Sequence, residues 1–126
     1  MSLSKTLALL GKLENRRKEL RDGLRLPADG LPGSLSQSHR RCGNERCHCF
    51  KGPGHLSWAL TFMVEGKKRV EYIPHELVDE VQRRMEAGNT YKRDVAELMA
   101  INAQMLILER RARREQAAAE KKMVAR

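Results

Sequence analysis

Three cysteines and one histidine form the strongest chemical signal in this sequence. Cys42, Cys47 and Cys49 lie within eight residues, and His55 follows after a short loop that contains glycine. Zinc prefers thiolate sulfur and imidazole nitrogen in a tetrahedral shell of four ligands. Neighbouring thiolates repel one another unless a cation neutralises them, so a bound Zn²⁺ stabilises such a segment directly. The pattern therefore predicts a zinc site formed by these four side chains.

The identity of the fourth ligand is open on spacing alone. Glycines before His55 allow the tight turns that could bring its imidazole back to the cysteines. His39 lies three residues before Cys42, and His48 lies between two cysteines, where its side chain tends to point away from a shared metal. Thiols without metal, or thiols that respond to oxidants, are the alternative to a zinc site.

A shell of four protein ligands indicates a structural rather than a catalytic metal, because no position remains for an activated water. The chain lacks the signature of zinc deaminases, and His75-Glu76 has no second histidine to complete a metalloprotease site. No Ser-His-Asp set, phosphate-binding loop or dinucleotide fingerprint can be assembled. We therefore expect a protein that is not an enzyme.

The charge of the chain favours a polyanionic partner. Lys and Arg number 25 against 16 Asp and Glu, and residues 1–41 alone hold 9 basic and 4 acidic side chains. Such an excess binds nucleic acid by releasing counterions, although a well-charged soluble surface is the alternative interpretation. We expect DNA phosphates to meet seven basic residues within residues 34–74: Arg40, Arg41, Arg46, Lys51, Lys67, Lys68 and Arg69.

Neither a membrane nor an oxidising compartment is indicated. No apolar run approaches the roughly 20 residues of a transmembrane helix, and the N-terminus lacks a signal-peptide core. An odd number of cysteines also argues against a disulfide framework. We expect a protein of the reducing cytoplasm, where thiolates remain available to a metal.

Hydrophobic periodicity divides the chain into three parts. Leucines at three- and four-residue steps predict an amphipathic helix over residues 1–26. In residues 34–74, Trp58, Leu60, Phe62 and Val64 alternate with a second set of side chains and predict a strand. A turn at Glu65-Gly66-Lys67 leads to a second strand that contains Val70, Tyr72 and Ile73 and ends before Pro74. Residues 34–41 are polar and are expected only to lead into the first cysteine.

Residues 75–126 are expected to be helical. Leu77, Val78, Val81 and Met85 mark one helix, which Gly88-Asn89 should end. A longer helix with coiled-coil character follows, and its seven-residue pattern predicts packing on the first helix or a dimer seam; the pattern comprises Tyr91, Leu98, Ile101, Met105, Leu108 and Ala112. The predicted fold is α+β, with a zinc-stapled antiparallel β-ribbon between an N-terminal helix and a C-terminal helix pair.

The motif Arg41-Cys42-Gly43-x-x-x-Cys47-x-Cys49, with His55 and Tyr72-Ile73-Pro74, resembles that of an uncharacterised bacterial family. This family is a domain of unknown function with the motif R-C-G-K-P-x-C-x-C…H-G-P-Y, often noted near transposases. The resemblance extends from about residue 33 to about residue 108. Asn44-Glu45 replaces the family's K-P, and Leu56-Ser57-Trp58 replaces its G-P-Y. The resemblance implies an accessory role in mobile DNA.

Taken together, these features favour a non-catalytic, zinc-binding, DNA-associated protein linked to mobile elements. Two other functions fit the same sequence. The long helix can dock a partner protein or a second copy, which would make the chain an adaptor or dimerisation module. The cysteines can also act as a redox or metal sensor, in which loss of zinc unfolds the ribbon.

Overall fold

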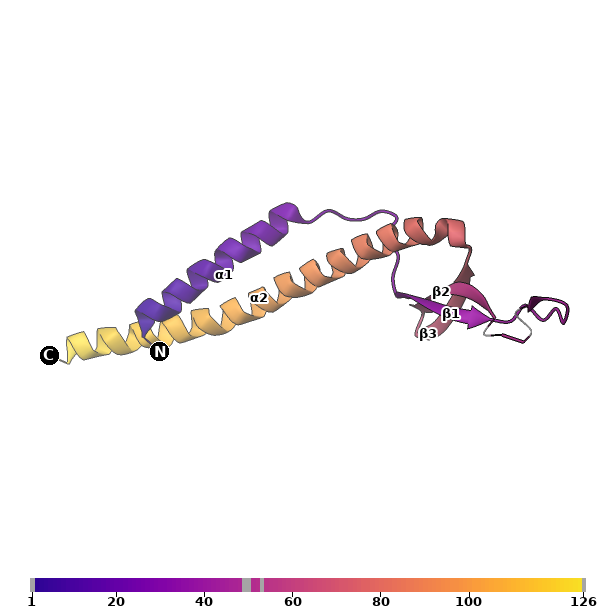
Figure 1. Ribbon diagram of the computed structural model, residues 1–126. Helices are drawn as coiled ribbons and strands as arrows, with labels where there is room; N and C mark the ends of the chain where they lie inside the picture. The colour runs from indigo at the N-terminus through magenta and orange to yellow at the C-terminus, as the bar shows by residue number, and fades with distance from the viewer. Residues whose placement is uncertain (1, 49–50, 53, 126) are drawn as a thin grey trace. The chain divides into compact units, whose positions relative to one another are not determined.

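The computed structural model describes residues 2–48, 51–52 and 54–125 (Figure 1). The elements follow in the order α1 (Leu3–Gly23), β1 (Ser34–Arg40), β2 (His55–Val64), β3 (Lys67–Ile73), a 3₁₀ turn (His75–Leu77) and α2 (Val78–Val124). This order confirms the predicted α+β class, with an antiparallel sheet between helical segments. The chain divides into two compact units: the helical unit, Met1–Leu26 with Tyr91–Arg126, and the sheet unit, Pro27–Thr90. Neither described helix is long and apolar enough to cross a membrane.

In the helical unit, α1 packs antiparallel to the C-terminal part of α2 (Figure 1). Leu20, Ile101 and Met105 are buried together, and Leu10, Leu13 and Leu98 pack against them. Ser2 caps the start of α1 by accepting a hydrogen bond from the backbone N–H of Lys5. The apolar pattern expected of the long helix is thus covered, at these positions, by the leucines of α1.

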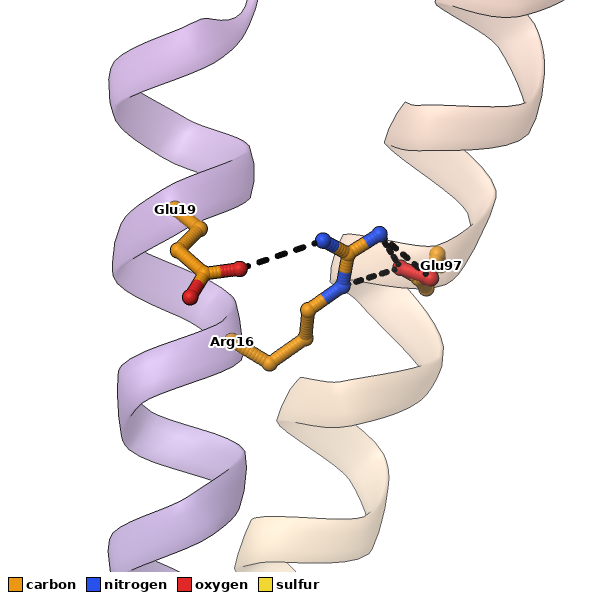
Figure 2. A network of polar contacts seen from close by, with 3 residues as sticks. All are labelled: Arg16, Glu19 and Glu97. Carbon is orange, nitrogen blue, oxygen red and sulfur yellow. Dashed lines mark hydrogen bonds and ion pairs between the residues drawn. The ribbon is translucent and has the colours of Figure 1, made fainter.

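Polar contacts flank this core. Arg16 of α1 donates from Nε and from its terminal nitrogen to the two carboxylate oxygens of Glu97, at 2.9 and 3.1 Å, and also reaches Glu19 (Figure 2). The bonds to Glu97, and then to Glu19, raise the pKa of the Arg16 guanidinium above its usual range. Thr6 is fully buried, and its hydroxyl donates to the Glu115 carboxylate at 3.1 Å. Thr6–Glu115 and Arg16–Glu97 fix the antiparallel register of the two helices.

In the sheet unit, the three strands lie in the order β1-β2-β3, and both pairs are antiparallel. Residues that pair across an antiparallel ladder share a face, so the register defines two faces. One is called the tryptophan face, and its residues are Leu35, Gln37, His39, Leu56, Trp58, Leu60, Phe62, Val64, Lys67, Arg69, Glu71 and Ile73. The other is called the serine face, and its residues are Ser34, Ser36, Ser38, Arg40, His55, Ser57, Ala59, Thr61, Met63, Lys68, Val70 and Tyr72.

The prediction of two strands was wrong, because β1 adds a third. Its sequence, SLSQSHR, is polar; Leu35 is half-buried, and the other six residues are exposed. The strand is held instead by its backbone ladder to β2 and by serine contacts across that ladder. The Ser57 hydroxyl, for example, donates to the Ser38 carbonyl at 3.2 Å. A strand at the edge of a sheet needs little apolar surface, so the polar sequence concealed it.

The predicted turn between β2 and β3 is confirmed in a shorter form. Glu65 and Gly66 alone connect the strands, and Lys67 already belongs to β3. Both residues have positive φ, 50° and 80°, which is the conformation of a type I′ hairpin turn. This turn fixes Val64 opposite Lys67 and thereby sets the register of the whole β2–β3 ladder.

The predicted helix stop at Gly88-Asn89 was also wrong, because α2 continues through it from Val78 to Val124. Gly88 does not cap the helix; it allows the backbone of the segment before β1 to lie close to the backbone of α2. The backbone N–H of Leu31 donates to the carbonyl of Arg84 at 3.0 Å, and Arg84 Nε donates to the Asp29 carbonyl at 2.8 Å. A Cβ on Gly88 would lie 2.6 Å from the Leu31 carbonyl oxygen. Only glycine lets the chain before β1 lie this close to α2.

Two glycine substitutions should therefore change stability in opposite directions. Gly88→Ala adds a Cβ against the Leu31 carbonyl and should destabilise the protein by about 1–3 kcal/mol, as overpacking does. Gly11→Ala meets nothing within 4 Å on α1 and should stabilise it by roughly 0.5–1 kcal/mol through helix propensity. Thermal unfolding followed by circular dichroism compares the midpoints; equal upward shifts would contradict the close approach.

Candidate metal centre

The pairing of β1 with β2 brings together the two ends of residues 41–54, which carry the cysteines and are called the cysteine loop below. Arg40 ends β1 and pairs with His55, the first residue of β2, so Cys42 lies two residues beyond this pair. Gly54 precedes His55 with a φ of 95°, and a Cβ there would lie 2.7 Å from the Arg40 carbonyl carbon. The two strand ends can meet only because this residue is glycine. Cys42 and His55 therefore approach each other from adjacent strands.

A tight turn brings Cys47 to the same place. Gly43 follows Cys42 with a φ of 84° and redirects the chain. Asn44 then organises the turn, because its side-chain oxygen accepts from the Arg46 backbone N–H and its carbonyl accepts from that of Cys47, each at 3.0 Å. A side chain that bonds to the backbone two residues later is a common turn device of asparagine. This turn sets Cys47 facing the two strand ends.

The three side chains form a group with the dimensions of a metal site. The ligand atoms of Cys42, Cys47 and His55 all lie within 4.8 Å of one another. Cys47 Sγ and His55 Nε2 are 3.1 Å apart. A tetrahedral zinc ion with ordinary bond lengths separates a sulfur from a nitrogen ligand by about 3.5 Å. Small movements of these side chains would suffice to coordinate an ion, so the group can hold a metal.

The remaining candidate ligands differ in position. Cys49 lies outside the described residues. His39 pairs with Leu56 and therefore lies on the tryptophan face, whereas His55 lies on the opposite face. His48 Nδ1 is 4.0 Å from Cys47 Sγ, and its ring meets the His55 ring edge to face with centroids 5.4 Å apart. Among the described residues, the metal-sized group comprises Cys42, Cys47 and His55 without His39 or His48.

The seven basic residues proposed for DNA contact are spread over three places. Arg41, Arg46 and Lys51 are exposed in the cysteine loop, where Arg41 also donates to the Gly52 carbonyl. On the sheet, Arg40 and Lys68 share the serine face, because they pair with His55 and Met63 of β2. Lys67 and Arg69 pair with Val64 and Phe62, so they share the other face.

Tyr72 is an addition that sequence reasoning had assigned only to a strand. The Arg40 guanidinium lies 4.1 Å from the centre of its ring, and the tyrosine is 54% exposed. Arginine over an aromatic face is attracted by the ring's quadrupole, which holds its charge in one position. The sequence analysis did not predict this contact because it did not predict β1. Arg40 belongs to that strand, and the strand order β1-β2-β3 brings its side chain across β2 to the Tyr72 ring.

Charge is distributed unequally between the two units. The helical unit holds 16 Lys and Arg against 8 Asp and Glu, an excess of eight. The sheet unit holds 9 against 8, an excess of one. The serine face nevertheless carries no acidic residue along its paired strands, while Glu71 lies on the tryptophan face with Arg69 3.8 Å away. Local charge on the sheet thus differs from its net charge.

The sequence also matches a known protein family. A family model described as a domain of unknown function (DUF6788) matches residues 10–83. The chain belongs to this family. The part matched by DUF6788 includes all three strands and the cysteine loop that carries the metal group. Neither a curated protein nor a solved structure matches the chain significantly.

Removal of one described ligand should remove the metal. Cys47→Ser should reduce bound zinc from one equivalent to less than about a tenth, because a structural site depends on every thiolate. Circular dichroism should show loss of sheet signal with retention of helix. Elemental analysis of protein purified with zinc measures the stoichiometry.

His39→Ala is the matched control, because this histidine lies on the other face and should leave one equivalent bound. Cys49→Ser then tests, in the same assay, the predicted cysteine ligand that lies outside the described residues. A full equivalent of zinc in Cys47→Ser would contradict the site.

Proposed function

We propose that this protein is a non-catalytic, zinc-stabilised DNA-binding protein. The observation that carries the proposal is the convergence of Cys42, Cys47 and His55 at the end of the β1–β2 ladder. The serine face of this sheet is basic and carries no acidic residue along the paired strands. The metal fixes the cysteine loop, and the serine face with that loop forms the surface for phosphates.

Zinc is the metal that the donor set favours. Two thiolates and one imidazole are soft or borderline ligands, and Cys49 would supply a third thiolate. Calcium and magnesium require oxygen ligands, and no carboxylate belongs to the described group. With four protein ligands the ion has no open position, so its role is to hold the loop closed rather than to activate water.

Several features of the serine face suit a phosphate backbone. Its small side chains, Ser34, Ser36 and Ser38, allow close approach of a ligand to the strands. Within the sheet, the Ser36 hydroxyl donates to the Ala59 carbonyl and the Ser38 hydroxyl lies 3.3 Å from that of Ser57. Arg40 and Lys68 supply positive charge, and Arg40 is held in place by Tyr72. Trp58, by contrast, is half-buried on the opposite face, where its indole nitrogen is shielded from solvent. Base stacking by Trp58 therefore plays no part in the proposal.

The helical unit contributes a different electrostatic effect. Its excess of eight positive charges is far larger than that of the sheet unit and attracts a polyanion over a distance set by the salt concentration. The serine face then provides the contacts of the bound state. The link to mobile DNA rests on the sequence resemblance alone, and it suggests a recombination accessory as the biological setting.

Two pairs of substitutions on the sheet test this proposal directly. The double variant R40A and K68A removes both cations of the serine face. The slope of log binding constant against log salt concentration is negative, and its magnitude should decrease by about 2. Fluorescence anisotropy with a labelled duplex, measured over a series of salt concentrations, gives this slope.

The double variant K67A and R69A is the matched control, because it removes the same charge from the opposite face of the sheet. It should leave the slope within about half a unit of the wild-type value. Equal losses in the two double variants would show that total charge, rather than the serine face, determines binding. Absence of any salt-dependent binding by the zinc-loaded protein would overturn the proposal.

A further inference from the structure

The C-terminal part of α2 is apolar on two opposite sides. One side carries Ile101 and Met105, which are 4% and 5% exposed in the core with α1. On the other side Met99 and Leu106 are 65% and 68% exposed. A helix with two apolar sides normally buries both of them, and α1 covers only one of the two.

The uncovered side has a regular pattern. Ala96, Met99, Ala103 and Leu106 recur at steps of three, four and three residues, which places them in one line along the helix. All four are exposed. Small and large side chains alternate along this line, which we call the second seam. Alternation of size is what two facing helices need for their side chains to interdigitate.

The second seam is complementary to itself in the antiparallel orientation. Ala96 and Leu106 lie five residues before and after Ile101, and Met99 and Ala103 lie two residues before and after it. A two-fold axis at this level would set each of these residues against its equidistant counterpart in a second copy. Every layer of the pair would then join one alanine with one large side chain. In a parallel pair, by contrast, each residue would meet its own copy.

Charged residues close the seam at both ends. Lys92 and Arg110 continue the same line, nine residues before and after Ile101, so the two copies would bring them together. Like charges at this position limit the contact to four apolar layers and oppose a shift of register, which would bury a cation among them. The flanking positions 100 and 102 are alanine and asparagine, and the Asn102 side chain already accepts a hydrogen bond from Arg17 of α1 at 3.3 Å.

From this pattern we infer that the exposed side of α2 is a dimer interface, and that its occupant is a second copy of the chain in antiparallel orientation. The interface is isologous, because the same residues contribute from both copies. Its apolar surface continues at Ile107, which is 60% exposed and lines a cavity of about 480 Å³ with Leu9, Leu13 and Leu108. The inference does not depend on DNA binding.

A charge exchange across the seam tests both the contact and its orientation. Met99→Glu and Ala103→Lys should each weaken self-association by at least about tenfold, because each sets an unpaired charge against an apolar side chain. The double variant sets Glu at 99 against Lys at 103 of the second copy, twice per dimer. It should recover association to within about threefold of the wild type. Sedimentation equilibrium of the zinc-loaded chain measures the dimer constants.

The controls separate this inference from simple unfolding and from DNA binding. Met99 and Ala103 are exposed, so every variant should retain the helical circular dichroism of the wild type. Ala118→Glu places the same charge on an exposed part of α2 off the seam and should leave the dimer unchanged. The end charges repel, so the dimer should not weaken at high salt, whereas DNA binding should.

Two results would overturn the antiparallel dimer. One is a wild-type chain that remains monomeric up to about 100 μM, a concentration at which four apolar layers should associate. The other is a double variant that associates no better than its parents. Either result leaves the DNA measurements unaffected, and loss of DNA binding leaves the sedimentation result unaffected.

Discussion

The pairing of β1 with β2 is the constraint on which the candidate metal centre and both faces of the sheet depend. It sets Arg40 opposite His55 and thereby brings the Cys42 sulfur to within 4.8 Å of an imidazole nitrogen of His55. A slip of β1 by one residue would move its side chains, Arg40 among them, to the tryptophan face, while His55 stayed on the serine face. The same slip would part Arg40 from the Tyr72 ring over which its guanidinium now lies. One register therefore determines the ligand set and the charge pattern together.

This pairing has little hydrophobic support of its own. Leu35 is the one apolar side chain in β1, and it is only half-buried. The hydrogen bonds between Ser38 and Ser57 are exposed and replace contacts with water at little net gain. A metal held between Cys42 and His55 would join the end of β1 to the start of β2. The proposed zinc therefore acts where the sheet is weakest, which gives it a structural task without any catalytic chemistry.

Sequence reasoning succeeded where residue types carry the physical information. The cysteine spacing identified Cys42, Cys47 and His55, which lie close enough together to hold a metal. The alternating apolar residues identified β2, and the leucine periodicity identified α1. It failed where a partner segment decides the outcome. β1 is too polar to be recognised alone, and it forms because β2 offers a free edge. Gly88 predicts the end of a helix when the local sequence is considered alone. In the structure it makes room for the backbone of Leu31, which lies 57 positions earlier in the chain.

The same dependence on partners explains the small core. With aromatics at 4% of residues, neither unit buries much apolar surface, and the described cluster in the helical unit contains three buried side chains. Small cores are usually completed by metals or by oligomerisation. In the sheet unit, a metal bound by the cysteine group would complete the core. In the helical unit, oligomerisation through the second seam of α2 would do so. Exposed Met99 and Leu106 are then expected features of a chain that completes its helical core with a second copy.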